Sequence, residues 1–124
     1  MKKYNYQKGR QGENIALVFL QKLSFELVEK NFQNKRGEID LIMIDKNVLV
    51  FVEVKLKVGQ DFGSPEDMIS PRKIWRVRRI AESFLVERPN LAKKYPQQRI
   101  DAVCMVLEKD GQVSRINHYK NIGG

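Results

Sequence analysis

The apolar and polar positions along the chain predict two helices. From Gly12 to about Leu23, apolar residues recur three and four positions apart and no helix breaker intervenes, which is typical of an amphipathic helix. A second helix is predicted from Pro71, with Ser70 as its N-cap, to about Glu87, before the next proline. Each helix therefore has an apolar face that can pack against another layer.

Five shorter apolar segments, rich in β-branched residues, predict strands. The polar residues 45–47 join two of these segments so closely that we expect an antiparallel hairpin. The order helix, three strands, helix, two strands predicts an α/β or α+β domain with a central sheet flanked by helices. The expected strands are 25–32, 39–44, 48–54, 100–107 and 113–119, and residues 59–71 and 90–98 are expected to be connections.

The length of 124 residues predicts one domain over 1–124, with flexible tails at 1–8 and 120–124. No apolar run approaches the roughly 18–20 residues of a membrane-spanning helix, and the polar, basic start does not resemble a secretory signal. The single cysteine, Cys104, has no partner for an internal disulfide and lies in an apolar run. We therefore expect a cytoplasmic protein that does not enter a membrane.

The net charge of the chain predicts the class of its binding partner. The chain carries 23 Lys and Arg residues against 15 Asp and Glu, a net charge of +8, which predicts a polyanionic partner such as nucleic acid. Five cations lie within residues 72–79, with no acid before Glu82. Clustered cations repel one another unless a polyanion neutralises them, so we expect a phosphate-backbone contact. The residues expected to contact nucleic acid are Lys35, Arg36, Arg72, Lys73, Arg76 and Arg79.

Three charged residues lie in otherwise apolar strands, and they are the candidates for chemistry. Asp40 lies in the 39–44 strand, and Glu53 and Lys55 share one face of the next strand. Burying them is costly unless they are paired or bind a cation, and carboxylate oxygens suit Mg²⁺ or Mn²⁺. Such a cation would activate water for phosphodiester hydrolysis, with Lys55 orienting that water. A buried Glu53–Lys55 ion pair, with Asp40 capping a turn, explains the same spacing equally well.

Glu13 lies on the same predicted helix face as the apolar Ala16 and Leu20. One interpretation is an acid in the first turn, favoured there by the helix dipole. The other is a carboxylate that points towards the metal site, and the sequence alone leaves both open. Arg99 and Asp101, at the start of a strand, are interpreted as a structural ion pair.

These residues, taken together and in this order, resemble the active-site pattern of the PD-(D/E)XK nuclease superfamily. More specifically, the chain is similar to the YraN family of small proteins predicted to be endonucleases. The motifs cover nearly the whole chain from about Gly9, although Ile39 stands where the superfamily has proline, Lys57 replaces an expected Arg, and the ending 121–124 is atypical. The motifs are Gly12-Glu13, Gly37-Glu38-Ile39-Asp40-Leu41-Ile42, Val50-Phe51-Val52-Glu53-Val54-Lys55, Phe62-Gly63 and Arg99-Ile100-Asp101.

The resemblance implies a restriction-endonuclease-like α/β core with a mixed five-stranded sheet, similar to Holliday-junction resolvases. It implies that Asp40 and Glu53 are metal ligands, that Glu13 is an auxiliary ligand, and that Lys55 orients the water. Mg²⁺ or Mn²⁺ is the expected cofactor, and resolvase-like relatives imply a homodimer. Residues on a shared fold need not be active, so the resemblance predicts the fold more firmly than the activity.

The leading hypothesis is a metal-dependent endonuclease that acts on DNA, branched or otherwise structured DNA included. The alternative is a non-catalytic nucleic-acid-binding module on a nuclease fold, which the basic helix supports equally well. In a third interpretation, the charges serve only solubility, and affinity for DNA would then not decline steeply with added salt.

Overall fold

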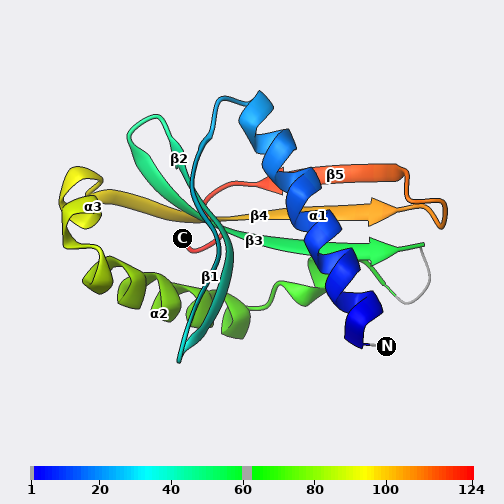
Figure 1. Cartoon of the computed structure of the whole chain (residues 1–124), viewed down its shortest axis with the longest axis horizontal. Helices are drawn as coiled ribbons and strands as arrows, with labels where there is room; N and C mark the ends of the chain where they lie inside the picture. The colour runs from blue at the N-terminus through cyan, green and yellow to red at the C-terminus, as the bar shows by residue number, and fades with distance from the viewer. Residues whose placement is uncertain (1, 60–62) are drawn as a thin grey trace.

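The computed structural model describes residues 2–59 and 63–124, with the side chains of 10–59 and 63–124. Over these residues the chain forms a five-stranded sheet with α1 across one face and α2 on the other (Figure 1). The elements are helix α1 (Lys2–Lys22), strands β1 (Glu26–Asn34), β2 (Gly37–Asp45) and β3 (Val48–Val58), the 3-10 helix η1 (Pro65–Met68), helices α2 (Pro71–Glu87) and α3 (Pro89–Lys94), and strands β4 (Gln97–Leu107) and β5 (Val113–Tyr119).

The strands lie in sequence order, β1-β2-β3-β4-β5, and the sheet is mixed. β1, β2 and β3 form an antiparallel meander, β4 pairs with β3 in parallel, and β5 returns antiparallel to β4. The parallel pair requires a crossover connection, and η1, α2 and α3 supply it. This arrangement confirms the α/β class and the five-stranded mixed sheet flanked by helices.

Two apolar cores, one on each face of the sheet, hold the layers together. On one face, Ala16 and Leu20 of α1 pack among buried residues that include Val50 and Val52 of β3. On the other face, Phe84 of α2 makes edge-to-face contacts with Phe32 and Phe51. Because β3 is buried on both faces along much of its length, any charged side chain that it carries there is shielded from water.

Several boundaries differ from the predicted ones. α1 begins at Lys2, whereas the predicted helix began at Gly12. The earlier start was not predicted because the polar residues before Gly12 show no apolar periodicity. α3 covers residues 89–94, which include the first part of the expected connection 90–98, and η1 lies inside the expected connection 59–71. Both are too short to leave a clear pattern of apolar residues.

The chain ends also bear on the expected tails. The backbone of residues 2–8 is helical, and near the other end the Ile122 N–H donates a hydrogen bond to the Ile100 carbonyl (2.8 Å). The flexibility of 1–8 and 120–124 stays a prediction. Among the described residues, no helix is both long and apolar enough to cross a membrane.

The start of α2 matches its sequence signal. Ser70 has extended backbone angles, its side-chain oxygen accepts a hydrogen bond from the Lys73 N–H (3.1 Å), and Pro71 begins the helix. We expect Ser70→Ala to lower the free energy of unfolding by about 1 kcal/mol, because one N–H of the first turn loses its partner. Urea denaturation measures this loss, and Ser114→Ala, on the exposed face of β5, serves as the control. Equal midpoints for the two variants would show that the cap does not stabilise α2.

Candidate active site

The candidate site lies where β2 separates from β3. The pairing of the two strands ends at Leu41 opposite Val52, and residues 37–40 of β2 diverge from β3 beyond that point. Asp40 Oδ2 accepts a hydrogen bond from the Val54 N–H (2.8 Å), in the position that a ladder carbonyl would otherwise take. The divergence opens a cleft of about 450 Å³ between the strands and α2. Its lining residues are Arg36, Gly37, Glu38, Asp40, Glu53, Val54, Lys55, Lys73, Arg76 and Ile80.

Two glycines allow the close packing around this cleft. At Gly12, α1 crosses β3 so closely that an added Cβ would lie 3.4 Å from Leu56 Cβ, and this approach places the next residue, Glu13, beside β2. Gly37 begins β2 with a φ of +142°, and a Cβ there would lie 2.8 Å from Ile80 Cδ1. Glycine at both positions thus lets the two helices approach the diverging strands.

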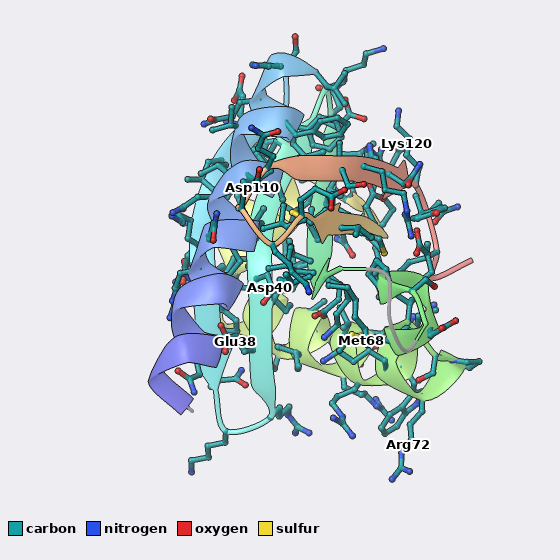
Figure 2. All side chains as sticks on the ribbon, turned by 90° about the vertical axis from the view of Figure 1, so that its right-hand side faces the viewer. Glu38, Asp40, Met68, Arg72, Asp110 and Lys120 are labelled. Carbon is teal, nitrogen blue, oxygen red and sulfur yellow. The ribbon has the colours of Figure 1, made fainter. Side chains whose placement is uncertain are left out.

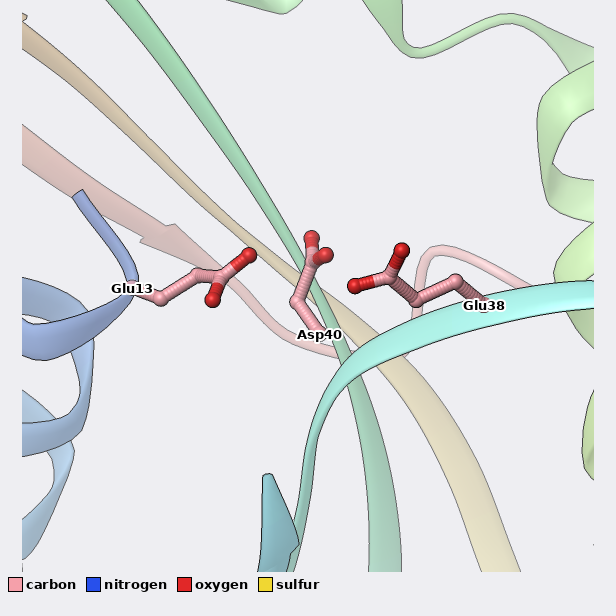
Figure 3. A group of neighbouring side chains, drawn as sticks. All are labelled: Glu13, Glu38 and Asp40. Carbon is pink, nitrogen blue, oxygen red and sulfur yellow. The ribbon is translucent and has the colours of Figure 1, made fainter. Parts of the chain in front are cut away.

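Carboxylates from a helix and two strands meet in this region. Oxygen atoms of Glu13, Glu38 and Asp40 lie within 4.8 Å of one another, and Figure 3 shows the three side chains converging from α1 and β2. Glu53 of β3 lines the same cleft as Asp40, and Asp40 interacts with both Glu13 and Glu53. The predicted ligands Asp40, Glu53 and Glu13 therefore share one site, although their role as ligands stays a prediction.

Burial and the close approach of these carboxylates raise the pKa values of two of them, Glu13 and Glu53. Burial and then the charge of Asp40 raise the pKa of Glu53 to about 8. The same two causes, in the same order, raise the pKa of Glu13 to about 7. Both carboxyls thus resist ionisation because the others lie close by and water is largely excluded.

Cationic side chains surround the acids. The Lys55 ammonium lies 3.6 Å from Glu53 Oε1, and the Lys73 ammonium from α2 lies 3.8 Å from the same oxygen. On the other side, Arg10 pairs with Glu13 (3.3 Å). The Glu53–Lys55 ion pair that the sequence left as an alternative is therefore present. It coexists with the acidic cluster rather than replacing it.

The donor set fits a hard divalent cation. Glu53 Oε2 is buried and has no hydrogen-bond partner among the described residues, an arrangement that costs free energy unless another group fills the coordination. The neighbouring donors are all carboxylate oxygens, the ligands that Mg²⁺ and Mn²⁺ prefer over the nitrogen and sulfur ligands of zinc. Repulsion among the carboxylates would also be relieved by a cation bound between them.

Two of the sequence alternatives are resolved by these positions. Glu13 is not in the first turn of its helix, because α1 begins at Lys2, so the helix-dipole explanation is wrong and the carboxylate faces Asp40. Asp40 caps no turn, since its hydrogen bond to Val54 crosses between two strands.

Sequence reasoning missed two members of the site. Glu38 is part of the acidic cluster. Its spacing of two residues from Asp40, which places both side chains on one face of a strand, is the sequence feature that indicates this position. Lys73, expected to contact phosphate from the flank of α2, lies close to Glu53 and lines the cleft, and its contact with phosphate stays a prediction. That contact joins residues far apart in the chain, so no local pattern could reveal it.

The other cations expected to contact nucleic acid occupy different places. Arg36 and Arg76 line the cleft, whereas Lys35 and Arg72 are exposed outside it. Figure 2 shows Arg72 projecting from α2 away from the body of the molecule. Arg79 is also exposed, but it pairs with Glu82 (3.2 Å). The cationic face of α2 thus extends outwards from the rim of the cleft.

Two further motif segments lie outside the cleft. Arg99 pairs with Asp101 (2.9 Å), which confirms the structural ion pair, and it also reaches Asp45 (2.8 Å). Of the Phe62-Gly63 motif, Phe62 lies outside the described residues. Gly63 has a φ of +90° and precedes η1, and a Cβ there would lie 2.6 Å from Asp67 Oδ2.

Comparison with known proteins places the chain among relatives of its own length. A UPF0102 protein of Syntrophomonas wolfei is 37% identical over 117 residues, 94% of this chain and 97% of the relative. One from Clostridium botulinum is 34% identical over 122 residues, 98% of this chain and 97% of the relative. Residues 12–105 match the family described as uncharacterised protein family UPF0102. The chain therefore belongs to the UPF0102 family, which is the YraN family that its motifs resemble.

Proposed function

We propose that this protein is a metal-dependent endonuclease that hydrolyses phosphodiester bonds in DNA, branched or otherwise structured DNA included. The observation that carries the proposal is the cleft itself, in which Glu53 Oε2, a buried carboxylate oxygen with no partner in the described part of the chain, lies among further carboxylates and two lysines. Perturbed carboxyls gathered in a cleft are typical of sites that do chemistry.

Asp40, Glu53 and Glu13 are the residues that would hold Mg²⁺ or Mn²⁺. When bound, the cation supplies a water of lowered pKa and polarises a phosphoryl oxygen. Lys55, on the same face of β3 as Glu53, would donate a hydrogen bond to the attacking water and offset charge developing on the phosphate. Glu53 fixes the Lys55 ammonium at the cleft, so the lysine is positioned before substrate binds.

Cationic side chains at the edge of the cleft, here called the cationic rim, would bind the substrate. Arg36 and Arg76 line the cleft, and Arg72 extends the charge along α2, so a DNA backbone at the cleft would meet cations on that side. Such contacts position the backbone without reading sequence. A homodimer would bring two such clefts to two strands, and a DNA substrate agrees with a cytoplasmic location.

The alternative is a nucleic-acid-binding module without turnover. The observation in its favour is that Lys55 and Lys73 already approach Glu53 Oε1, so that the buried charge is partly balanced without a metal ion. In that case, the cleft would bind DNA through its rim and the acids would serve only the fold.

Cleavage of labelled branched and linear DNA in Mg²⁺ and in EDTA tests the proposal. We expect wild-type protein to cut in Mg²⁺ only, and Glu53→Ala and Lys55→Ala to lose at least about 100-fold in rate, because each removes a group that acts on the transition state. Binding to DNA in EDTA should be nearly unchanged in both variants. Lys93→Ala, which removes an exposed lysine from α3, is the charge-matched control for Lys55→Ala.

Two results would contradict the proposal. Cutting by the Glu53→Ala protein at the wild-type rate would identify a contaminating nuclease. Metal-independent binding by wild-type protein, with no cutting of any substrate in Mg²⁺ or Mn²⁺, would favour the binding module.

A further inference from the structure

Trp75 is a large aromatic side chain that the fold leaves in water. It is the single tryptophan of the chain, and 57% of its surface is exposed. The buried face of α2 is formed by Val77, Ile80, Ala81 and Phe84, and Trp75 lies on the opposite side of the helix from them. Packing of the core therefore does not require an indole at this position.

The indole is flanked by cations. Arg72 and Arg79, three residues before and four residues after it, lie on the same side of the helix. The Arg79 guanidinium lies 5.2 Å from the centre of the indole ring, a cation–π distance. Arg79 is itself held by Glu82 (3.2 Å), so the arginine next to the ring is anchored from its other side.

This part of α2 is continuous with the candidate active site. Arg36 lines the cleft and also a neighbouring hollow of about 370 Å³, to which Arg79 contributes. Around the helix, Arg76 at the cleft is followed by Arg72 and Arg79, and then by Trp75. A polyanion that leaves the cleft across α2 thus meets three arginines and reaches the aromatic ring.

Cations beside an exposed aromatic ring form the combination that binds single-stranded nucleic acid, because phosphates pair with the cations while a base stacks on the ring. In a continuous duplex the faces of the bases are already stacked on their neighbours. Away from the ends of a duplex, only an unpaired base can offer its face to an indole on the protein surface. Phosphate contacts alone would need arginines but no tryptophan.

We propose that Trp75 is a stacking platform for an unpaired base, so that the site prefers single-stranded or locally unpaired nucleic acid to a continuous duplex. This inference rests on the nucleic-acid binding in the proposed function and does not depend on turnover. Trp75 acts here as a specificity-determining residue, outside the carboxylate cluster.

Tryptophan fluorescence offers a direct test, because Trp75 is the single tryptophan of the chain and all tryptophan emission comes from it. In EDTA, a single-stranded oligonucleotide should quench the Trp75 emission at saturation, as judged by the anisotropy of a label on the oligonucleotide. The same sequence as a duplex should bind with little quenching. Trp75→Ala should weaken single-strand binding by about 5- to 100-fold and duplex binding by less than about twofold.

Two matched variants complete the experiment. Trp75→Phe should recover most of the single-strand affinity, because phenylalanine keeps a stacking face. Val18→Ala, which trims a half-exposed apolar residue on α1, should bind both oligonucleotides as wild type does. Unchanged emission at saturating single strand, or wild-type affinity of Trp75→Ala, would overturn the inference. A protein that shows quenching but never cuts DNA would keep the inference and reject the nuclease.

Discussion

Asp40→Asn is expected to abolish the stabilisation that Mg²⁺ or Mn²⁺ gives the wild-type protein. A cation that binds only the folded state at about 100 times its Kd stabilises that state by about 2.7 kcal/mol, which for a domain of this size corresponds to roughly 10 °C in Tm. The variant removes the carboxylate that interacts with both Glu13 and Glu53. Its amide oxygen can still accept the hydrogen bond from the Val54 N–H, so the strand contact is kept.

Without metal, the same substitution should raise the Tm by several degrees. The charge of Asp40 is the second cause, after burial, of the raised pKa values of Glu13 and Glu53, and its removal relieves that repulsion. Differential scanning fluorimetry in EDTA and in metal measures both effects. A metal-induced rise that survives in Asp40→Asn would show that the cation binds elsewhere.

The pH dependence follows from the same two carboxyls. A carboxyl whose pKa is raised by folding binds more protons in the folded state, so its contribution to stability is full below the unfolded pKa and is lost as pH rises through the folded value. With folded values of about 7 for Glu13 and about 8 for Glu53, metal-free wild-type protein should lose stability from about pH 5 to pH 8. The loss should be smaller in Asp40→Asn, where burial still raises both pKa values but the charge of Asp40 no longer does.

Asp110→Asn is the matched control for the two expected effects of Asp40→Asn on Tm, the loss of stabilisation by metal and the rise in Tm without metal. Asp110 lies in the turn between β4 and β5, and its side chain likewise accepts a backbone N–H, that of Gln112 (3.0 Å). Because the chain has a net charge of +8, loss of a negative charge should not stabilise it through long-range electrostatics. A rise in Asp40→Asn without a rise in Asp110→Asn therefore isolates local repulsion.

The fold was predictable where short-range chemistry specified it. α2 begins at Pro71 after the Ser70 cap and ends at Glu87 as expected, because capping and proline geometry are properties of neighbouring residues. The start of α1 was not predictable, because the residues before Gly12 lack an apolar stripe. Ile80 is buried against Gly37 at the start of β2, a contact that depends on how α2 docks on the sheet.

The site was predictable in its strand residues and less so in its helix residues. The alternation of side chains in a strand was enough to place Glu53 and Lys55 on one face. The approach of Lys73 and Glu13 depends on where two helices cross the sheet, which no local pattern encodes. The spacing also could not show that Asp40 would take the place of a ladder carbonyl where β2 leaves β3.

The candidate site and the surroundings of Asp101 in β4 differ in how their buried charges are balanced. Asp101 is fully buried, and its two oxygens accept from Arg99 (2.9 Å), from the Asn121 N–H (2.9 Å) and, at 2.8 Å, from His118. Burial raises the pKa of Asp101, but these hydrogen bonds outweigh it and hold the pKa below the usual range. A carboxylate so completely partnered serves the fold, whereas Glu53 keeps an oxygen available.

Asp101→Ala should accordingly be the most destabilising of the substitutions considered, by about 3–5 kcal/mol, because it leaves the Arg99 guanidinium without its main buried partner. Urea denaturation at pH 7 measures the loss, and Asp45→Ala, which removes the half-buried second partner of Arg99, should cost much less. Since the folded pKa of Asp101 is lowered, its contribution is present above the unfolded pKa and is lost as pH falls through the folded value. The difference in stability between wild type and Asp101→Ala should therefore shrink in acid. A cost below about 1 kcal/mol at pH 7, or a difference that grows in acid, would contradict this assignment.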